Sequence, residues 1–381
     1  MPGAGESEVA DLAAAVRDTY RAAEDSLLDV VAEEARRTWQ RNLKPDRRRR
    51  SEVVDQAQAA ARVGAHAARI AKRLEAQAPA VADEVTRVAA ERGERAARRE
   101  LDTLLGRQSR RDRGSAPGRS PELVRASRGL VDALSPAHSS ILRTTRDAYR
   151  DAVADTLGPY SSGAIGREEM ARRAMATLGD QGVTEFRDRA GRRWELASYV
   201  EQATRAASAR VMVDSLVDRS AASGTRLFYV PDVQGECALC RPWEGEILSA
   251  DGSLVGEVEV ENVLTSEPMT IEVKASLAEA RAAGFLHPSC RHGVSPFVPG
   301  ASRPPTNTAD PQGERDRERL RALERHVRHW KRREAAAFDQ VGRAQAKAKV
   351  RDWQAAIRDH TKSTGLIRQP KRERVGPGVV R

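Results

Sequence analysis

Apolar residues recur at helical spacing over the first hundred residues. Steps of three and four positions from Glu6 to about Leu43 form one face of a long helix, which the sequence Lys44-Pro45-Asp46 ends. A second helical stretch runs to Leu104, and we expect Pro79 to break it. Alanine dominates the apolar seam, so residues 1–106 are predicted to form long bundle or coiled-coil arms rather than a large globular core.

Helical periodicity stops and then returns in the middle of the chain. Residues 107–121 show no periodicity and are predicted to be a linker. Ser120 followed by Pro121 is typical of a helix N-terminus. Residues 122–225 are therefore predicted to be a mostly helical segment, with separate helices near 167–178 and 195–219.

The period changes again at residue 226. Alternating apolar and polar positions predict short strands over 226–230, 257–260 and 269–273. Ser276 and Glu279 have the spacing of a capping box at the start of a short helix. Residues 226–300 are thus predicted to be a small α+β module, which we call the Cys/His module.

Beyond a proline-rich link, apolar positions at helical spacing resume. Residues 301–365 are predicted to be a basic amphipathic helix or a tight helical hairpin ending at Gly365, and 366–381 to be disordered. The fold class is therefore α+β, with long α-helices predominating and one small module that a metal could staple.

Composition and charge sharpen this picture. Aromatic residues make up only 4% and charged residues 31% of the chain, as in proteins built from exposed helices. Residues 301–381 carry a net charge of +11, and residues 221–300 carry −6. A basic arm favours polyanions such as nucleic acid, although a solvated helix face explains the pattern equally well. No apolar run approaches the length of a membrane span, so we expect no membrane contact and synthesis in the cytoplasm.

All three cysteines of the chain lie in the Cys/His module, together with two histidines. Cys237-x2-Cys240 is followed by His287-x2-Cys290-x-His292, which is ligand spacing for a tetrahedral Zn²⁺. The three thiolates would be joined by either His287 or His292, and the spacing leaves that choice open. Four protein ligands predict a structural site rather than a catalytic one. The alternative is that these are ordinary buried thiols beside surface histidines.

No motif indicates an enzyme. We find no Ser/His/Asp arrangement with supporting context, no phosphate-binding loop and no dinucleotide fingerprint. The rival hypothesis is a metal-supported DNA endonuclease, because such folds also use Cys-x2-Cys staples. It is disfavoured because no His-plus-Asn constellation follows and the module is acidic.

The sequence around the ligand candidates resembles a known family. The segments ECALCRPWEGEILSADG (236–252) and AEARAAGFLHPSCRHGVSPFVPG (278–300) are similar to phage minor capsid protein 2 and MuF-type head-morphogenesis proteins. The likeness spans about residues 120–365. In MuF-type relatives the second element ends Cys-Arg-Cys where this chain has Cys290-Arg-His292, and this difference favours His292 as the fourth ligand.

The resemblance implies a structural protein of a phage or prophage virion, not an enzyme. It implies a location near the portal or inside the head, and in the bacterial cytoplasm during assembly. The expected partners are the portal and other capsid proteins, and non-specifically bound double-stranded DNA through the basic C-terminal helix. We also consider a homo-oligomer.

Overall fold

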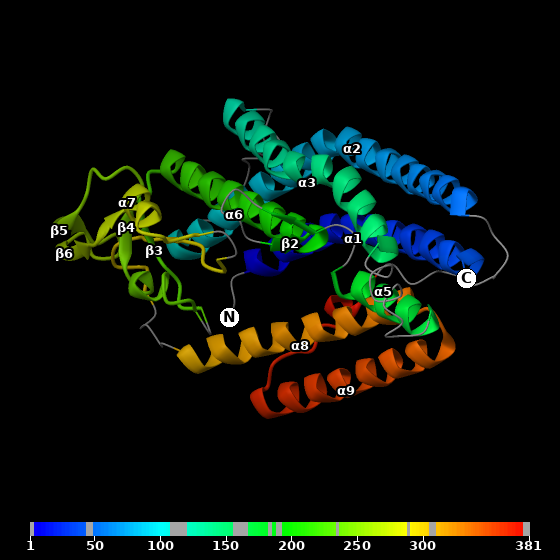
Figure 1. Ribbon diagram of the computed structural model, residues 1–381. Helices are drawn as coiled ribbons and strands as arrows, with labels where there is room; N and C mark the ends of the chain where they lie inside the picture. The colour runs from blue at the N-terminus through cyan, green and yellow to red at the C-terminus, as the bar shows by residue number, and fades with distance from the viewer. Residues whose placement is uncertain are drawn as a thin grey trace. The chain divides into compact units, whose positions relative to one another are not determined.

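The computed structural model describes residues 4–42, 49–106, 120–154, 167–181, 185–187, 193–233, 236–287, 290–304 and 310–375. Long helices predominate, and short strands are concentrated between residues 227 and 296 (Figure 1). The helices are α1 (Ala4–Asn42), α2 (Arg49–Leu105), α3 (Pro121–Ala154), α5 (Arg167–Gln181), α6 (Leu196–Ala222), α7 (Leu277–Ala282), α8 (Pro311–Ala336) and α9 (Gln340–Thr364), with 3-10 turns η1 (Arg241–Trp243) and η2 (Pro370–Glu373). The strands are β1 (Glu185–Arg187), β2 (Arg193–Glu195), β3 (Leu227–Tyr229), β4 (Ile247–Ser249), β5 (Gly256–Glu261), β6 (Pro268–Val273), β7 (Ala275–Ser276) and β8 (Ser295–Pro296). The predicted α+β class with predominant long helices is confirmed.

The chain folds into two compact units, each assembled from three separate segments. Unit 1 comprises Met1–Ala15, Pro79–Ala133 and Glu201–Asp316, and unit 2 comprises Val16–Ala78, Leu134–Val200 and Arg317–Arg381. A helix of 57 residues is about 85 Å long, which is more than one compact core can cover. Helices α1, α2, α3, α6 and α8 each contribute residues to both units.

Helix α2 continues through Pro79, where we had expected a break. Proline removes one backbone hydrogen bond, but Pro79 is exposed, so water can satisfy the carbonyl that this frees. Leu74, Ala78 and Ala82 remain buried on either side of it. The buried apolar residues on both sides of Pro79 therefore keep the helix continuous through the proline.

Unit 2 contains a bundle of α1, the first half of α2 and the second half of α3. Polar groups at its helix contacts are paired: the Tyr20 hydroxyl lies 2.6 Å from His138 Nε2, and the Arg62 guanidinium donates two hydrogen bonds to Glu34 at 2.9 and 2.7 Å. Thr38 and Tyr149 join α1 to α3 through their hydroxyls at 3.1 Å. These pairs satisfy polar groups in an interior made mostly of alanine, leucine, valine and isoleucine.

Two forms were predicted for the C-terminal region, a single amphipathic helix or a helical hairpin, and the structure has the hairpin. Helices α8 and α9 lie side by side (Figure 1), and Leu320, Leu323 and Val327 pack against Val350 and Ile357. Asp339 caps the start of α9, and Gly365, in the left-handed conformation at φ 72°, ends it.

The segment after α9, which we expected to be disordered from residue 366, contains the turn η2. Glu373 is buried there and accepts hydrogen bonds from Arg368 at 2.5 and 2.7 Å and from Gln354 of α9 at 3.0 Å. These bonds anchor residues 366–375 to the hairpin, which corrects the expectation for this part. Residues 376–381 lie outside the described residues, as do residues 107–119 of the predicted linker.

In unit 1 the Cys/His module is built on a small four-stranded sheet. The strand order is β7-β4-β3-β8, with β4 and β7 parallel and the other pairs antiparallel. Strands β5 and β6 form a separate antiparallel hairpin, as alternation predicted. Its apolar face, with Val258, Val260 and Ile271, packs on Leu227 and Phe297.

The other face of the sheet rests on helices of the same unit. Phe228, Leu248 and Phe285 share one buried cluster with Val213 and Leu216 of α6 and Ala97 of α2; Cys240 belongs to this cluster too. The helices therefore support the cysteine-bearing loops by packing against them in this cluster.

Candidate metal centre

Two loops of the Cys/His module bring the candidate ligands together. The first is the turn from Cys237 to Cys240, in which the Cys237 carbonyl accepts from the backbone N–H groups of Cys240 and Arg241 at 3.1 and 3.0 Å. The second follows α7, whose capping box between Ser276 and Glu279 is present as predicted. The chain then turns at Gly284 (φ 101°) and Leu286 (φ 57°) before reaching His287. A leucine in the left-handed region is strained, which is typical of a backbone that its surroundings hold for a functional geometry.

The structure places all five predicted ligand residues in one cluster. Cys237 Sγ lies 2.9 Å from His287 Nε2, Cys240 Sγ lies 3.3 Å from Cys290 Sγ, and Cys290 Sγ lies 3.5 Å from His292 Nδ1. Within each of two overlapping triads the donor atoms lie within 4.8 Å of one another. The triads are Cys237, Cys240, His287 and Cys240, Cys290, His292.

The donor set fits a tetrahedral zinc ion. With Zn–S bonds of about 2.3 Å, tetrahedral geometry puts ligand atoms about 3.5–3.8 Å apart. The observed contacts of 2.9–3.5 Å need an expansion of only a few tenths of an ångström to reach it. The cluster can therefore hold an ion with little movement of the two loops.

Glu244 joins the site from the turn after η1. Its Oε1 lies 2.6 Å from His292 Nε2 and accepts from the backbone N–H of Val233 at 3.0 Å. Both the Glu244 and His292 side chains are almost completely buried, at 0% and 1% exposure. A carboxylate that binds one ring nitrogen of a histidine fixes the ring and leaves the other nitrogen free for a metal. Here Glu244 takes Nε2 and directs Nδ1 toward Cys290.

The thiols and the imidazole are polarised in a way that prepares them for a metal. The hydrogen bond from Cys240 lowers the pKa of Cys290 to about 4, with His292 adding to the effect, and it raises the pKa of Cys240. Burial disfavours a charged His292, but its bonds to Cys290 and Glu244 outweigh burial and raise its pKa. The lowered pKa of Cys290 favours the thiolate, which is the form that binds a metal. Zinc would replace the protons that hold the cluster together, so binding would release them.

The sequence pattern indicated five candidate ligands but not Glu244. The two neighbours of Glu244 shape the turn: Trp243 packs on Phe285 with ring centroids 6.2 Å apart, and Gly245 adopts φ 78°. Glu244 lies 48 residues from His292 in the sequence. The only feature of the sequence that could have pointed to Glu244 is its position four residues after Cys240.

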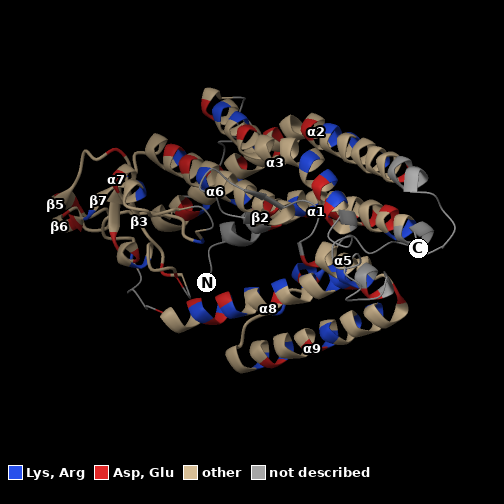
Figure 2. Cartoon of the chain, in the orientation of Figure 1, with Lys and Arg blue, Asp and Glu red and all other residues tan. Residues whose placement is uncertain are grey.

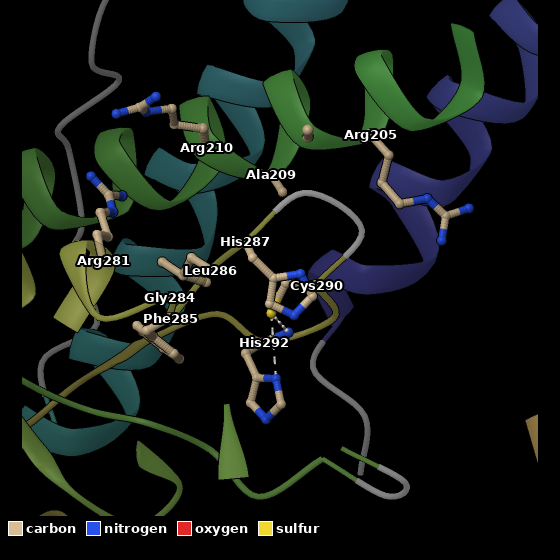
Figure 3. Close-up of a pocket in the computed structure, with 11 residues that line it drawn as sticks. Arg205, Ala209, Arg210, Arg281, Gly284, Phe285, Leu286, His287, Cys290 and His292 are labelled. Carbon is tan, nitrogen blue, oxygen red and sulfur yellow. Dashed lines mark hydrogen bonds between the residues drawn. The ribbon is translucent and has the colours of Figure 1, made fainter. Parts of the chain in front are cut away.

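A cavity of about 320 Å³ opens beside the cluster (Figure 3). Residues 284–287 with Cys290 and His292 form one wall, and α6 forms the other with Ala206, Ala209 and Arg210. Arg205 and Arg281 also line it, but each is bound to an acidic residue, Glu201 at 3.0 Å and Asp214 at 2.6 Å. The cavity is therefore an approach to the sulfur atoms from the α6 side, not a strongly cationic pocket.

Replacing Glu244 with glutamine should weaken zinc binding by about 10-fold, and alanine by up to about 100-fold, because His292 would lose its orienting carboxylate. Competition with a chromogenic zinc chelator measures the affinity. Glu246→Gln is the matched control, since the Glu246 side chain is partly exposed and forms its ion pair with Lys274 at 2.7 Å, away from the cluster. Equal affinities for both variants would show that Glu244 does not position a ligand.

No helix in the described parts of the chain is both long and apolar enough to cross a membrane.

Comparison with known proteins identifies the family to which this chain belongs. No curated protein and no solved structure matches it. Residues 6–362 of the 381 match the family described as phage minor capsid protein 2, which includes the long helices, the Cys/His module and the C-terminal hairpin. The chain is a member of the phage minor capsid protein 2 family.

Proposed function

We propose that this protein is a non-enzymatic structural component of a phage or prophage virion. The observation that carries this is the match of residues 6–362 to the phage minor capsid protein 2 family. The geometry of the Cys/His cluster supports it, because four protein ligands would fill the coordination sphere of a zinc ion and leave no position for substrate or water.

In this proposal zinc is a structural staple. Cys237, Cys240 and Cys290 supply three thiolates, and His292 is the fourth ligand. His292 is preferred over His287 because Glu244 fixes its ring with Nδ1 facing Cys290. His287 then stays within hydrogen-bond reach of Cys237 and supports its thiolate. The ion would join two loops whose cysteines are 50 residues apart in sequence.

The Cys/His module is proposed to dock the protein onto portal or other capsid proteins near the portal or on the inner side of the head. Its exposed hairpin β5–β6 carries Glu257, Glu259, Glu261 and Glu272 on one face (Figure 2). Such a surface favours basic protein partners and repels nucleic acid. Copies of the chain would collect there from the bacterial cytoplasm during assembly, as single chains or as a homo-oligomer. The basic hairpin α8–α9 is proposed to contact the packaged DNA without sequence preference.

The alternative, a metal-supported endonuclease, would draw on the cavity beside His287 and His292. It is the weaker proposal because His292 is committed to Glu244 and Cys290, and because the acidic module opposes DNA. A plasmid-cleavage assay with Mg²⁺ distinguishes the two: the structural proposal predicts no cleavage above that of a Cys240→Ser preparation.

Quantitative mass spectrometry of purified particles tests the proposed function directly. We expect a few copies per particle, measured against the portal and major capsid proteins, and the same number in DNA-filled heads. A protein that is made in the infected or induced cell but absent from particles would contradict the virion assignment.

A further inference from the structure

Helix α9 carries five cationic side chains in one line. They are Arg343, Lys347, Arg351, Arg358 and Lys362, and all five are exposed. At 3.6 residues per turn, their spacing confines them to an arc of about 100° on the helix. At a rise of about 1.5 Å per residue the line is about 28 Å long. We call this set the α9 basic stripe; Figure 2 colours the lysines and arginines along α9 blue.

The stripe is not neutralised by acidic residues. Among the residues that the structure describes, no ion pair reaches any of its five members. The acids of α9 itself, Asp352 and Asp359, lie outside the arc of the stripe, and Asp352 faces Lys349 at 3.8 Å. Glu373, in the segment that follows α9, is occupied by Arg368 and Gln354.

Several exposed arginines elsewhere in the chain are paired with glutamates on the same helix. Arg87 contacts Glu84 and Glu91, Arg125 contacts Glu122, and Arg173 contacts Glu169, all at separations of three or four residues. Such pairs are the ordinary way to stabilise a solvated helix face. None of the five stripe residues has such a partner among the described residues, so their charges remain available to an external anion.

The rigidity of α9 presents these charges at a fixed spacing. A neighbouring face of the helix, about 90° round from the centre of the stripe, packs on α8 through Val350 and Ile357, and both ends are capped. Stripe residues one turn apart are separated by about 6 Å along the axis. A rigid row of cations loses less conformational entropy on binding a polyanion than a flexible tail does.

The chemistry of the stripe favours a phosphate backbone over an acidic protein. Protein interfaces bury a centre in which aromatic residues are enriched and lysine is depleted. The stripe has no aromatic or large apolar member between Arg343 and Lys362. Non-specific DNA binding needs only positive charge against phosphates.

We infer that the α9 basic stripe binds the phosphate backbone of double-stranded DNA and does not read its sequence. The inference rests on the proposed function for the presence of DNA beside the protein, and it adds which residues make the contact. Each cation that meets a phosphate releases counterions, so affinity should fall steeply with salt.

The test compares two triple variants of the full chain that lose the same charge. One removes stripe residues (Arg343→Gln, Arg351→Gln, Arg358→Gln), and the other removes arginines paired on their own helices (Arg87→Gln, Arg125→Gln, Arg173→Gln). Fluorescence anisotropy with a labelled 20-bp duplex, repeated from 50 to 300 mM NaCl and with two unrelated sequences, gives affinity and salt slope. The stripe variant should lose about 2.7 from the slope of log K against log salt, and on the order of 10²-fold in affinity near 0.1 M. The paired variant and the second sequence should change neither.

Equal losses in both triple variants would overturn the inference, because binding would then follow net charge alone. Unchanged DNA binding together with loss of self-association by the stripe variant, measured by sedimentation, would also overturn it and assign the stripe to a protein interface. The outcome is separable from the proposed function. A chain found in particles that binds no duplex refutes the stripe alone, and a chain absent from particles that binds duplex through α9 refutes the virion role alone.

Discussion

Replacing Cys240 with serine should unfold the Cys/His module while leaving most of the α-helical signal of the chain. Cys240 is completely buried, lies 3.3 Å from Cys290 and belongs to both triads of the candidate metal centre. Structural zinc contributes an apparent free energy of about 10–16 kcal/mol. This is comparable to the whole stability of a typical domain, about 5–15 kcal/mol. Without the ion, a module with so small a sheet should not stay folded.

Three measurements test this prediction: zinc per chain by elemental analysis, helicity by circular dichroism at 222 nm, and limited proteolysis within residues 226–300. A strong chelator supplies the matched comparison. Chelated wild type should reproduce the Cys240→Ser protein, and the variant should not respond further to the chelator, because both treatments remove the same ion.

Two results would count against the zinc proposal. One is a Cys240→Ser protein that the protease cleaves no faster than the wild type. The other is a wild-type protein whose melting temperature does not change when the chelator is added. A loss of most helicity in the variant would show instead that the module and the helices unfold as one cooperative unit.

Local signals in the sequence predicted much of the fold. The alternation of Val258 and Val260 with glutamates gave the β5 strand, and the Ser276/Glu279 capping box gave the start of α7. Gly365 marked the end of α9 because few other residues adopt a positive φ without cost. These signals succeed because each depends only on residues within one turn or one strand.

Features that depend on distant contacts could not be predicted. The burial of Glu373 depends on Gln354 and Arg368, and the continuity of α2 through Pro79 depends on a seam whose packing partners the sequence does not name. The division into two units depends on which stretch of each long helix meets which core. Periodicity gives the apolar face of a helix but not its neighbour.

The candidate site shows the same contrast. Cysteine and histidine spacing identified five donors that the fold indeed brings together, because metal ligands are rare residue types in this chain. Glu244 is one acidic residue among 55 Asp and Glu, so nothing in the sequence distinguishes it. Its 2.6 Å contact with His292 in the structure is what distinguishes Glu244.

Adding a side chain at Gly93 should be among the most damaging changes outside the metal centre. Gly93 lies where α2 meets α6 within unit 1, and a Cβ there would stand 2.1 Å from the backbone oxygen of Met212 and 3.0 Å from the Cβ of Ser215. A backbone oxygen cannot rotate away, so the two helices must separate by about 1.4 Å to restore ordinary contact distances of about 3.5 Å. Overpacking of this kind costs about 1–3 kcal/mol. We expect Gly93→Ala to lower the free energy of unfolding by about 2 kcal/mol and Gly93→Leu by about 3 kcal/mol.

Gly129 is the control for this change, because it lies exposed in α3 and an added Cβ meets nothing within 4 Å. There the better helix propensity of alanine should raise the free energy of unfolding by up to about 1 kcal/mol. Chemical denaturation followed by circular dichroism compares the two positions. The Gly93 variants should also release zinc faster, because Ala97, Val213 and Leu216, which flank this helix contact, support Phe285 and Cys240 from below. If Gly93→Ala proved as stable as Gly129→Ala, α2 and α6 would not be in close contact, and the helices could not be the platform that positions the Cys/His loops.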